Sequence, residues 1–283
     1  MCVKISIIKG DFICYGGVII KNLNFDCITL DGVNKLIDCT KNRVTVLETV
    51  DSTNLYLKRN ADTAQNGDVV IALSQTNGRG RFTRKFHSPQ NTGIYMSFFL
   101  QPQLPAIQAV LITTAAAVAV CEACEQLGAE KCEIKWVNDV LINSKKVCGI
   151  LTEGSVNSQN GMLDYAILGI GINVYEPEGG FDDEIKNIAG SVFKKVENGL
   201  SDRLVAEIIN RFMKYFKDIE NKPFLDSYRE RSYITGKNIN VIKLDSTKPA
   251  KAISIDDKFK LLVEYEDKTQ EYISSGEVSV RTI

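Results

Sequence analysis

The spacing of the apolar residues changes near residue 233, and this change constrains the fold more than any other feature of the sequence. Residues 201–220, SDRLVAEIINRFMKYFKDIE, have the periodicity of an amphipathic helix. After residue 233 the apolar residues occur only in short β-rich runs that are separated by turn-forming residues. The sequence therefore predicts a large helix-containing domain over residues 43–232 and a small β-barrel over residues 233–283.

The large domain is predicted to be α+β, with helices packed on a mixed sheet. RVTVLETV reads as a strand, and the side chains of Asp51, Ser52, Thr53 and Asn54 after it suit a helix N-cap. An Ala-rich apolar stretch that begins near Pro105 and stops at Gly128 predicts a long helix. Ser201 or Asp202 is expected to open the helix over 201–220. The other expected strands are DVVIALSQ, GIYMSFFLQ, KCEIKWV, KVCGILTEG and DYAILGIGINV.

Residues 1–42 are predicted to form an N-terminal extension and not a full DNA-binding domain. The run ISIIKGDFICYGGVIIKN reads as a hairpin with Gly16-Gly17 at its turn, and a short helix is the alternative. This stretch is too short for a three-helix DNA-reading module. No internal repeat or low-complexity linker interrupts the chain.

Composition is that of an ordinary globular protein. The net charge of −1 and the pI near 6.0 provide no overall positive field, so we expect no nucleic-acid partner. Lys4 and Lys9 interrupt the apolar N-terminus, and the longest apolar run ends at Glu122, so we expect neither a signal peptide nor a membrane partner. With no such signal, the eight cysteines are expected to be reduced thiols. These features predict a cytoplasmic protein.

Few side chains are suited to metal or nucleophilic chemistry. Cys121, Cys124 and Cys132 lie in or near the Ala-rich helix, but no second cysteine pair or neighbouring histidine completes a zinc site. His87 is the only histidine, so a Ser-His-Asp or Cys-His mechanism would depend on this one imidazole. Catalysis by this chain is therefore predicted to be electrostatic and positional.

Two segments indicate an anion-binding site that faces a carboxylate. Residues 78–84 read GRGRFTR, in which two glycines allow the backbone to approach a ligand and three arginines offer planar forks for phosphate or carboxylate. Taken alone, this loop also suits a solvated basic turn. Residues 135–139, KWVND, add a lysine, an asparagine and a carboxylate, and an activated acid with a phosphate leaving group would suit the combination.

Six segments in order resemble biotin protein ligase: DSTN, SQTNGRGR, KWVNDV, KKVCGIL, GIGINV and SSGEVSVR. The resemblance extends from about residue 28 to the end of the chain. It implies a catalytic domain like that of class II synthetases with an SH3-like C-terminal β-domain. It also implies an ATP-dependent biotin–[acetyl-CoA-carboxylase] ligase, which makes biotinyl-5′-AMP and transfers biotin to a lysine of a carrier protein. With no winged helix before residue 43, a monofunctional ligase is expected.

The resemblance also implies roles for individual residues. Ser52, Thr53, Asn54 and Gln75 are expected to bind the ureido end of biotin, and the remaining biotin-binding residues are Gly78, Arg79, Gly80, Arg81 and Lys146. Expected ATP-binding residues are Arg79, Arg81, Phe86, Lys135, Asn138 and Asn173. Lys146, Asp139 and Arg81 are the expected catalytic residues. Asp139 is predicted to act either through Mg²⁺ or on the incoming lysine amine.

Three positions depart from the family pattern: Phe82 and Thr83 follow the GRGR motif, and Val137 stands where proline is common. The first two bear on how the loop closes over the adenylate. A lipoate or octanoate transferase of similar fold and a biotin-sensing regulator are the alternative functions. Polar groups placed for a ureido ring disfavour lipoate. A homodimer is compatible with exposed strand edges, while the carboxylase that is modified and the role of residues 1–27 stay open.

Overall fold

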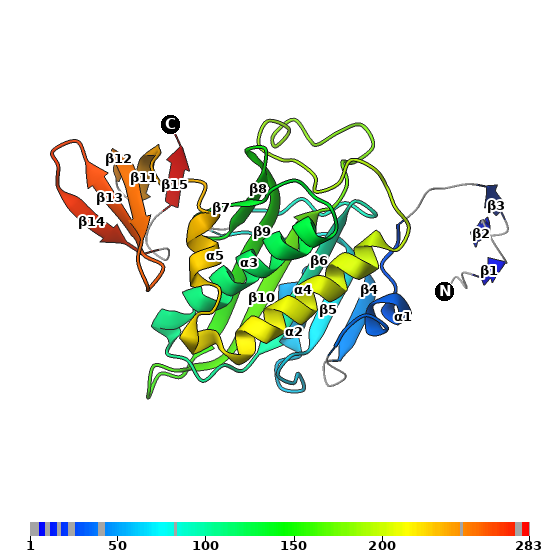
Figure 1. Ribbon diagram of the computed structural model, residues 1–283. Coiled ribbons are helices and arrows are strands. Elements are labelled where there is room, and N and C mark those ends of the chain that lie inside the picture. Colours follow the sequence, from blue (N-terminus) through cyan, green and yellow to red (C-terminus); the bar gives the residue numbers. More distant parts are fainter. Residues whose placement is uncertain are drawn as a thin grey trace.

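The structure is a computed structural model, and it describes residues 6–8, 12–15, 18–21, 26–38, 43–81, 84–243, 246–274 and 279–282. The described strands form three separate sheets of three, seven and five strands (Figure 1). The seven-stranded sheet is mixed and carries helices on both faces, which confirms the predicted α+β class.

The central sheet has the order β4-β5-β6-β10-β9-β8-β7. β4 and β5 are parallel, because helix α2 connects them, and every other neighbouring pair is antiparallel. The strands are β4 (Val44–Val50), β5 (Val69–Gln75), β6 (Gly93–Leu100), β7 (Glu133–Lys135), β8 (Asp139–Ile142), β9 (Lys145–Val156) and β10 (Leu163–Asn173).

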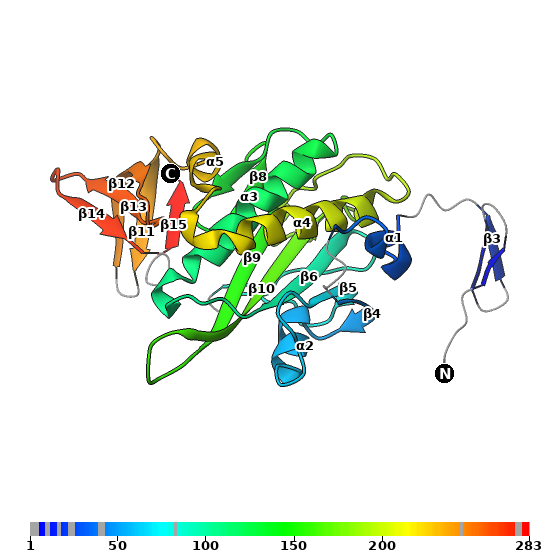
Figure 2. The ribbon, with the colours of Figure 1, turned by 60° about the horizontal axis from the view of Figure 1, so that its bottom comes forward.

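The two faces of this sheet are covered very differently. The long helices α3 (Val110–Gln126) and α4 (Leu200–Lys217) lie side by side across one face, and the short helix α2 (Thr53–Arg59) lies on the other (Figures 1 and 2). Strand periodicity directs Met96 and Phe98 into the main core under the long helices, whereas Phe99 packs with Leu57 in a small cluster under α2. The short helix therefore leaves room on its face of the sheet.

The same alternation positions the glycines of β9 and β10. Ile150 and Ile170 belong to the main core under α3 and α4. Their sequence neighbours Gly149, Gly169 and Gly171 consequently lie on the α2 face. Without side chains, these three positions leave a recess in the surface of the sheet.

Helix α3 is close to its predicted span. A 3₁₀ turn, η1 (Ala106–Gln108), precedes it, and Gly128 follows it with a φ of +90°. Residues 106–126 are apolar and long enough to cross a membrane, with a mean hydropathy of 1.8, but 67% of the most apolar window is buried inside the protein. A core helix of this kind satisfies the same criteria.

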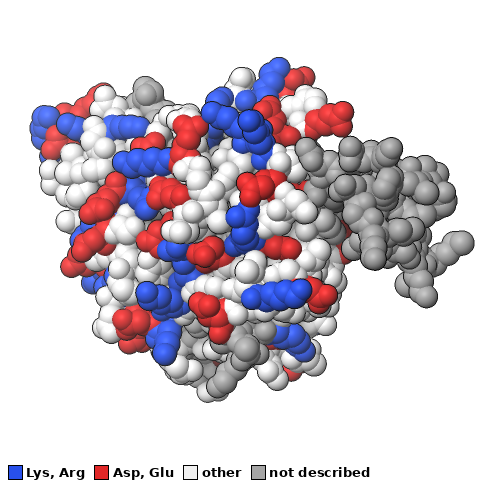
Figure 3. Space-filling model, turned by 45° about the vertical axis from the view of Figure 1, so that its right-hand side comes forward, with Lys and Arg blue, Asp and Glu red and all other residues white. Residues whose placement is uncertain are grey.

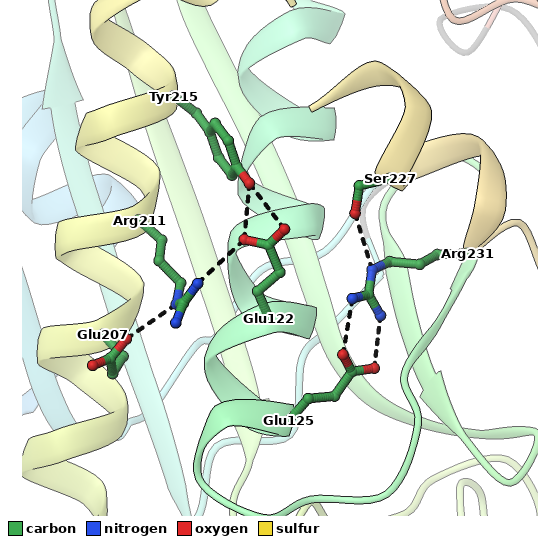
Figure 4. Close-up of polar contacts among 7 residues, drawn as sticks. All are labelled: Glu122, Glu125, Glu207, Arg211, Tyr215, Ser227 and Arg231. Atoms are coloured by element: carbon green, nitrogen blue, oxygen red, sulfur yellow. Dashed lines mark hydrogen bonds and ion pairs between the residues drawn. The ribbon is translucent and has the colours of Figure 1, made fainter. Parts of the chain in front are cut away.

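Polar contacts join α3 to α4 and to α5 (Leu225–Glu230) on the helical side of the protein (Figure 4). Glu122 on α3 accepts hydrogen bonds from Tyr215, at 2.8 and 2.9 Å, and lies 3.5 Å from Arg211. Three residues further on, Glu125 accepts a bidentate pair from Arg231 at 2.6 and 2.8 Å. These contacts set the position of α3 against both neighbouring helices.

Helix α4 begins differently from the prediction. Gly199 occupies the N-cap position with a φ of +75°, and Ser201 and Asp202 lie within the first turn. The Asp202 carboxylate accepts hydrogen bonds from the backbone and the hydroxyl of Thr29, at 2.7 and 3.0 Å. Thr29 caps α1 (Leu30–Asn34), so Asp202 joins two helices instead of capping its own.

The C-terminal strands form the separate small β-domain that the sequence predicts, and all their neighbouring pairs are antiparallel. This sheet packs against the central domain beside α5 and the 3₁₀ turn η2 (Ile219–Asn221). Trp136 Nε1 donates to the carbonyl oxygen of Phe259 at 2.9 Å, and the Phe259 ring stacks on Phe224. The strands of the C-terminal sheet are β11 (Asn238–Lys243), β12 (Ser246–Ile255), β13 (Leu261–Tyr265), β14 (Gln270–Ile273) and β15 (Ser279–Thr282).

The remaining sheet is formed by β1 (Ser6–Ile8), β2 (Phe12–Tyr15) and β3 (Val18–Lys21), with both pairs antiparallel. Tyr15 is opposite Val18, and the predicted turn residues Gly16 and Gly17 lie outside the described residues.

The surface carries charges of both signs. Figure 3 shows blue and red side chains interspersed on the face that it presents, without a continuous field of one sign. This pattern accords with the near-zero net charge of the chain.

Candidate active site

A cavity of about 830 Å³ lies on the α2 face of the central sheet. It falls in the size range of small-molecule sites. Every predicted site residue except Gly78 lines this cavity. Gly78 is buried behind it, where an added Cβ would lie 2.4 Å from the carbonyl oxygen of Phe86. Side chains separated by more than 120 positions in the sequence therefore face one space.

One end of the cavity is a network of neutral polar groups. Gln75 Oε1 accepts from the backbone N–H of Thr53 at 2.9 Å, and Gln75 Nε2 donates to Ser88 at 3.0 Å. The hydroxyl of Ser97, which is fully buried, lies 2.7 Å from Thr53 Oγ1 and 2.6 Å from Asn54 Oδ1. Buried polar side chains that bond to one another are held in single orientations, as a specific ligand requires.

The side chains predicted to cap α2 have different roles in the structure. Ser52 is the N-cap residue of α2 but its side chain makes no capping hydrogen bond, and it borders the cavity instead. The Asp51 carboxylate accepts from the Ser52 N–H at 2.8 Å and forms a bidentate pair with Arg59. Hydrogen bonds from Arg59 lower the pKa of Asp51 to about 2. The structure thus leaves the Ser52 hydroxyl available to a ligand.

The other end of the cavity carries cations around one carboxylate. Lys146 Nζ lies 2.6 Å from Asp139 Oδ1. Arg81 donates to Asn138 Oδ1 at 3.2 Å, and Asn138 in turn donates to the carbonyl oxygen of Ile150 at 2.8 Å. Arg79, Gly80 and Lys135 also line the cavity. Asn138 therefore connects the arginine loop to β9.

The Arg81 guanidinium is held in a partly dehydrated position. Burial lowers its pKa, and Asp139 opposes this effect by stabilising the charged form. Arginine nevertheless stays protonated in proteins. An anion that entered the cavity would therefore meet a fixed positive charge where water screens it weakly.

Phe86 forms part of the cavity wall between the two ends. Its ring packs over the recess made by the glycines, since a Cβ added to Gly171 would lie 2.6 Å from the ring and one added to Gly149 would lie 3.2 Å from it. The ring also meets Tyr95 edge to face, with centroids 6.4 Å apart. The glycines at 149 and 171 are thus explained by the close approach of an aromatic ring.

A segment that no motif predicted, residues 184–190, forms one rim of the cavity. The Lys146 N–H donates to Ile188 at 2.7 Å, and Asn173 Nδ2 donates to the carbonyl oxygen of Gly190 at 3.0 Å. Lys145, the sequence neighbour of Lys146, donates to the carbonyl oxygen of Asn187 at 2.5 Å. Asn173 therefore holds the rim as well as bordering the cavity.

Sequence reasoning also missed Ser97 and Glu153. Both lie within strands and outside the motifs that marked the site, although Gly154 follows Glu153. Only the period-two alternation could have placed them on the same face as Gly149 and Gly169. The sequence assigned no role to His87. Its Nδ1 lies 3.1 Å from Asp182 Oδ2, in the segment leading to the rim.

Comparison with known proteins matches two family models to this chain. Residues 46–173 match the biotin/lipoate A/B protein ligase family, and residues 234–281 match the biotin protein ligase C-terminal domain. The first range contains all the predicted site residues, and the second begins at residue 234, before β11, and ends within β15. The two models thus match separate parts of the chain.

Individual relatives agree with these models. The bifunctional ligase/repressor BirA of Bacillus subtilis is 36% identical over 206 residues, which are 71% of this chain and 62% of that protein. The biotin–[acetyl-CoA-carboxylase] ligase of Mycobacterium tuberculosis is 28% identical over 82% of this chain and 87% of its own length. The chain thus spans somewhat under two thirds of the BirA protein.

A solved structure is similar as well. The biotin protein ligase from Aquifex aeolicus in complex with biotin and ATP superposes with a TM-score of 0.72 at 28% identity. The match covers 85% of this chain and 99% of that one. The likeness therefore extends over the central domain and beyond it.

Proposed function

We propose, because the chain belongs to the biotin protein ligase family, that it is an ATP-dependent enzyme that activates biotin and attaches it to a carrier protein. The acceptor would be one lysine of the biotin carboxyl carrier domain of a biotin-dependent carboxylase. The named activity of the M. tuberculosis relative and the ligands of the A. aeolicus structure support this proposal.

One observation carries the proposal: a single cavity has hydrogen-bonding groups at one end and cations at the other. Thr53, Asn54 and Gln75 form the uncharged end, and Arg81 and Lys146 form the charged end. Biotin has the same polarity, with a ureido group at one end and a carboxylate at the other. The ring and chain between them are apolar, as is the Phe86 side chain in the cavity wall.

In the first step, a carboxylate oxygen of biotin attacks the α-phosphorus of ATP, and the bond to the departing pyrophosphate breaks. Two anions must approach one another, so their repulsion dominates the barrier. Arg79, Arg81 and Lys146 would neutralise this charge, with Arg81 already fixed through Asn138. A biotin contact is assigned to Gly80 through the loop backbone, and Ser52 would complete the ureido contacts. Gly78, also expected to contact biotin, lies outside the cavity lining and instead holds the loop by accepting a 2.9 Å hydrogen bond from the Phe86 N–H.

The nucleotide would lie beside the rim of the cavity. We assign adenylate contacts to Phe86, Asn138 and Asn173, and phosphate contacts to Lys135 together with the arginines. Phe86 would offer its ring to the base, and Asn173 already orders the rim through Gly190. An ordered rim would help to shield the adenylate from water.

In the second step, the neutral lysine amine of the carrier attacks the acyl carbon, the acyl–oxygen bond to AMP breaks so that AMP leaves, and the proton released from the nitrogen passes to water. Asp139 lies at the charged end and is the carboxylate nearest Lys146. We propose that Asp139 orients the incoming lysine amine and, while that group is still protonated, lowers the cost of bringing a second cation beside Lys146. Asp139 therefore belongs to the transfer step in this proposal.

Mg²⁺ is proposed to accompany ATP. Among the residues that the structure describes, no group of three or more His, Cys, Asp or Glu side chains is arranged to hold a metal ion. Mg²⁺ in nucleotide sites commonly takes one or two carboxylates and completes its shell with phosphate oxygens and water. Asp139 would supply one such carboxylate, and a single carboxylate is enough for that pattern. The ion would then add positive charge at the phosphates.

The neutral polar end argues against lipoate as the acid. A lipoate ring has no hydrogen-bonding groups for the polar side chains at that end, so it would displace water from them without replacing the hydrogen bonds that a ureido group makes. An unsatisfied buried polar group costs about 1–3 kcal/mol. Two such groups would give discrimination on the order of a hundredfold.

The test is transfer of biotin to a purified biotin carboxyl carrier domain with Mg-ATP, together with ATP–pyrophosphate exchange to follow adenylate formation. We expect the native enzyme to label one carrier lysine, with lipoate in excess leaving the rate unchanged. Lys146→Ala and Arg81→Ala should each slow adenylation by about a hundredfold or more, because each removes a charge at the reacting groups.

A folded native enzyme that forms no adenylate would refute the proposal. Adenylate formation without transfer would refute only the assignment of the acceptor. Attachment of lipoate would instead refute the ureido assignment. Cytoplasmic location, a homodimer and the boundaries at residues 42 and 232 remain predictions.

A further inference from the structure

Glu153 connects the two ends of the cavity although it does not line it. It lies on β9, on the same face as Gly149. Its Oε2 accepts from Asn54 Nδ2 at 2.9 Å, and its Oε1 lies 3.0 Å from Arg79 Nη1. One carboxylate thus contacts a residue of the neutral end and a residue of the arginine loop.

We propose that Glu153 is a positioning residue. Asn54 holds the Glu153 carboxylate, which in turn directs Arg79 toward the reacting carboxylate of the acid. The inference rests on the proposed biotin-activating function and deepens it. In this arrangement the polar end does more than bind the acid, because it also prepares the cationic end. Glu153 itself touches no substrate.

Asn54 is well fixed at its end of the connection. Its amide oxygen lies 2.6 Å from the Ser97 hydroxyl, and its amide nitrogen donates to Glu153. The Glu153 carboxylate can only accept a hydrogen bond, so it must face the amide nitrogen of Asn54. The amide oxygen of Asn54 then faces the Ser97 hydroxyl, which can donate to it. Gly169 provides the space, since an added Cβ would lie 2.3 Å from Asn54 Oδ1.

Arg79 needs a partner of this kind. Its side chain is 39% exposed, and a long exposed arginine side chain samples many rotamers that cost free energy to restrict. The backbone on the two sides of the loop is already paired. Arg79 and Lys85 form an antiparallel β-bridge, and the Gly80 N–H donates to the carbonyl oxygen of Arg84 at 2.7 Å. Glu153 adds the side-chain restraint that the backbone lacks.

The consequence is a connection between acid binding and activation. The Asn54 amide is already held by Ser97 and holds the Glu153 carboxylate in turn, so an acid that binds to Asn54 binds to a group that also supports Arg79. The carboxylate keeps the Arg79 guanidinium in place before the nucleotide phosphates arrive. Restricting Arg79 in advance lowers the entropy lost in the transition state.

Glu153→Gln separates the two contacts of this carboxylate. The glutamine carbonyl still accepts from Asn54, so we expect the Kd for biotin, measured by calorimetry, to change less than about twofold. The charge that holds Arg79 is lost, and kcat for pyrophosphate exchange should fall about threefold to tenfold, which is the range for a partly exposed ion pair with charged hydrogen bonds. Glu153→Ala should weaken biotin binding as well.

The control is Glu207→Gln, which removes a carboxylate that pairs with Arg211 at similar exposure on α4, away from the cavity. It should leave both the Kd and kcat unchanged. In an Arg79→Ala background, Glu153→Gln should have almost no further effect on kcat, because the two changes remove the same interaction. Equal melting temperatures for native enzyme and Glu153→Gln would separate positioning from stability.

An unchanged kcat in Glu153→Gln, with an active native enzyme, would overturn the inference. Additive effects of Glu153→Gln and Arg79→Ala would overturn it as well. A native enzyme that binds biotin but forms no adenylate would instead overturn the proposed function, and this inference with it.

Discussion

Gly169→Ala tests directly whether the polar end is built as the structure shows. An added Cβ would lie 2.3 Å from Asn54 Oδ1, about 1 Å closer than carbon and oxygen normally approach. Asn54 must move by that amount, which breaks its 2.6 Å contact with Ser97 and its 2.9 Å bond to Glu153. One neutral and one charged hydrogen bond together account for about 2–4 kcal/mol.

We expect this cost to appear as a melting temperature lower by about 4–12 °C for a chain of this size, with biotin affinity reduced in calorimetry. Gly154→Ala is the matched control on the adjacent strand, because its Cβ would meet the end of the Leu163 side chain at 2.9 Å and a backbone oxygen at 3.3 Å, and neither belongs to the polar end. In an Asn54→Ala background, Gly169→Ala should cost much less. Equal costs in the two backgrounds would show that the contact with Asn54 does not explain the glycine.

Three further changes give separate tests. Ser97→Ala removes a buried hydroxyl from the polar end and should weaken biotin binding about fivefold to thirtyfold in calorimetry; an unchanged affinity would contradict its placement. Trp136→Phe removes the 2.9 Å hydrogen bond to Phe259 and should lower the free energy of unfolding by about 1–3 kcal/mol, measured by denaturant titration, and no loss would argue against this domain contact. Burial raises the pKa of Glu125, but hydrogen bonds from Arg231 outweigh it and leave the pKa below its usual 4.5. The contribution of Glu125 is therefore complete above pH 4.5 and is lost as the pH falls through the lower folded value, so native protein should lose more stability than Glu125→Gln in melts between about pH 5 and 3.

Motifs located the candidate site well because the groups that bind anions are close together in the sequence. Arg79 and Arg81 lie in one loop, and Asn138 and Asp139 begin one short strand, so each segment displays its chemistry without the fold. Ser97 and Glu153 could not be recognised in the same way. Neither belongs to a recognisable motif, and their partner Asn54 lies 43 and 99 positions away, respectively.

Helix boundaries show the same limit. Ser201 and Asp202 have the side chains of an N-cap, yet Gly199 takes that position. Asp202 accepts hydrogen bonds from Thr29, which lies 173 positions earlier. The carboxylate is therefore bonded to Thr29 instead of to the backbone N–H groups of its own helix. Local capping preferences could not have revealed a partner so distant.

The sequence by itself determined the mixed α+β domain, the C-terminal β-domain and the residue types of an anion site, because periodicity, turn residues and motifs act over short spans of chain. Only the tertiary structure decided which end of the cavity each residue faces, that Asn173 and Lys145 hold the rim, and that Glu153 joins Asn54 to Arg79. These contacts depend on the order of strands in the sheet and on the short α2 that leaves one face open. Strand order and helix placement follow from burying the whole core at once, which no local pattern records.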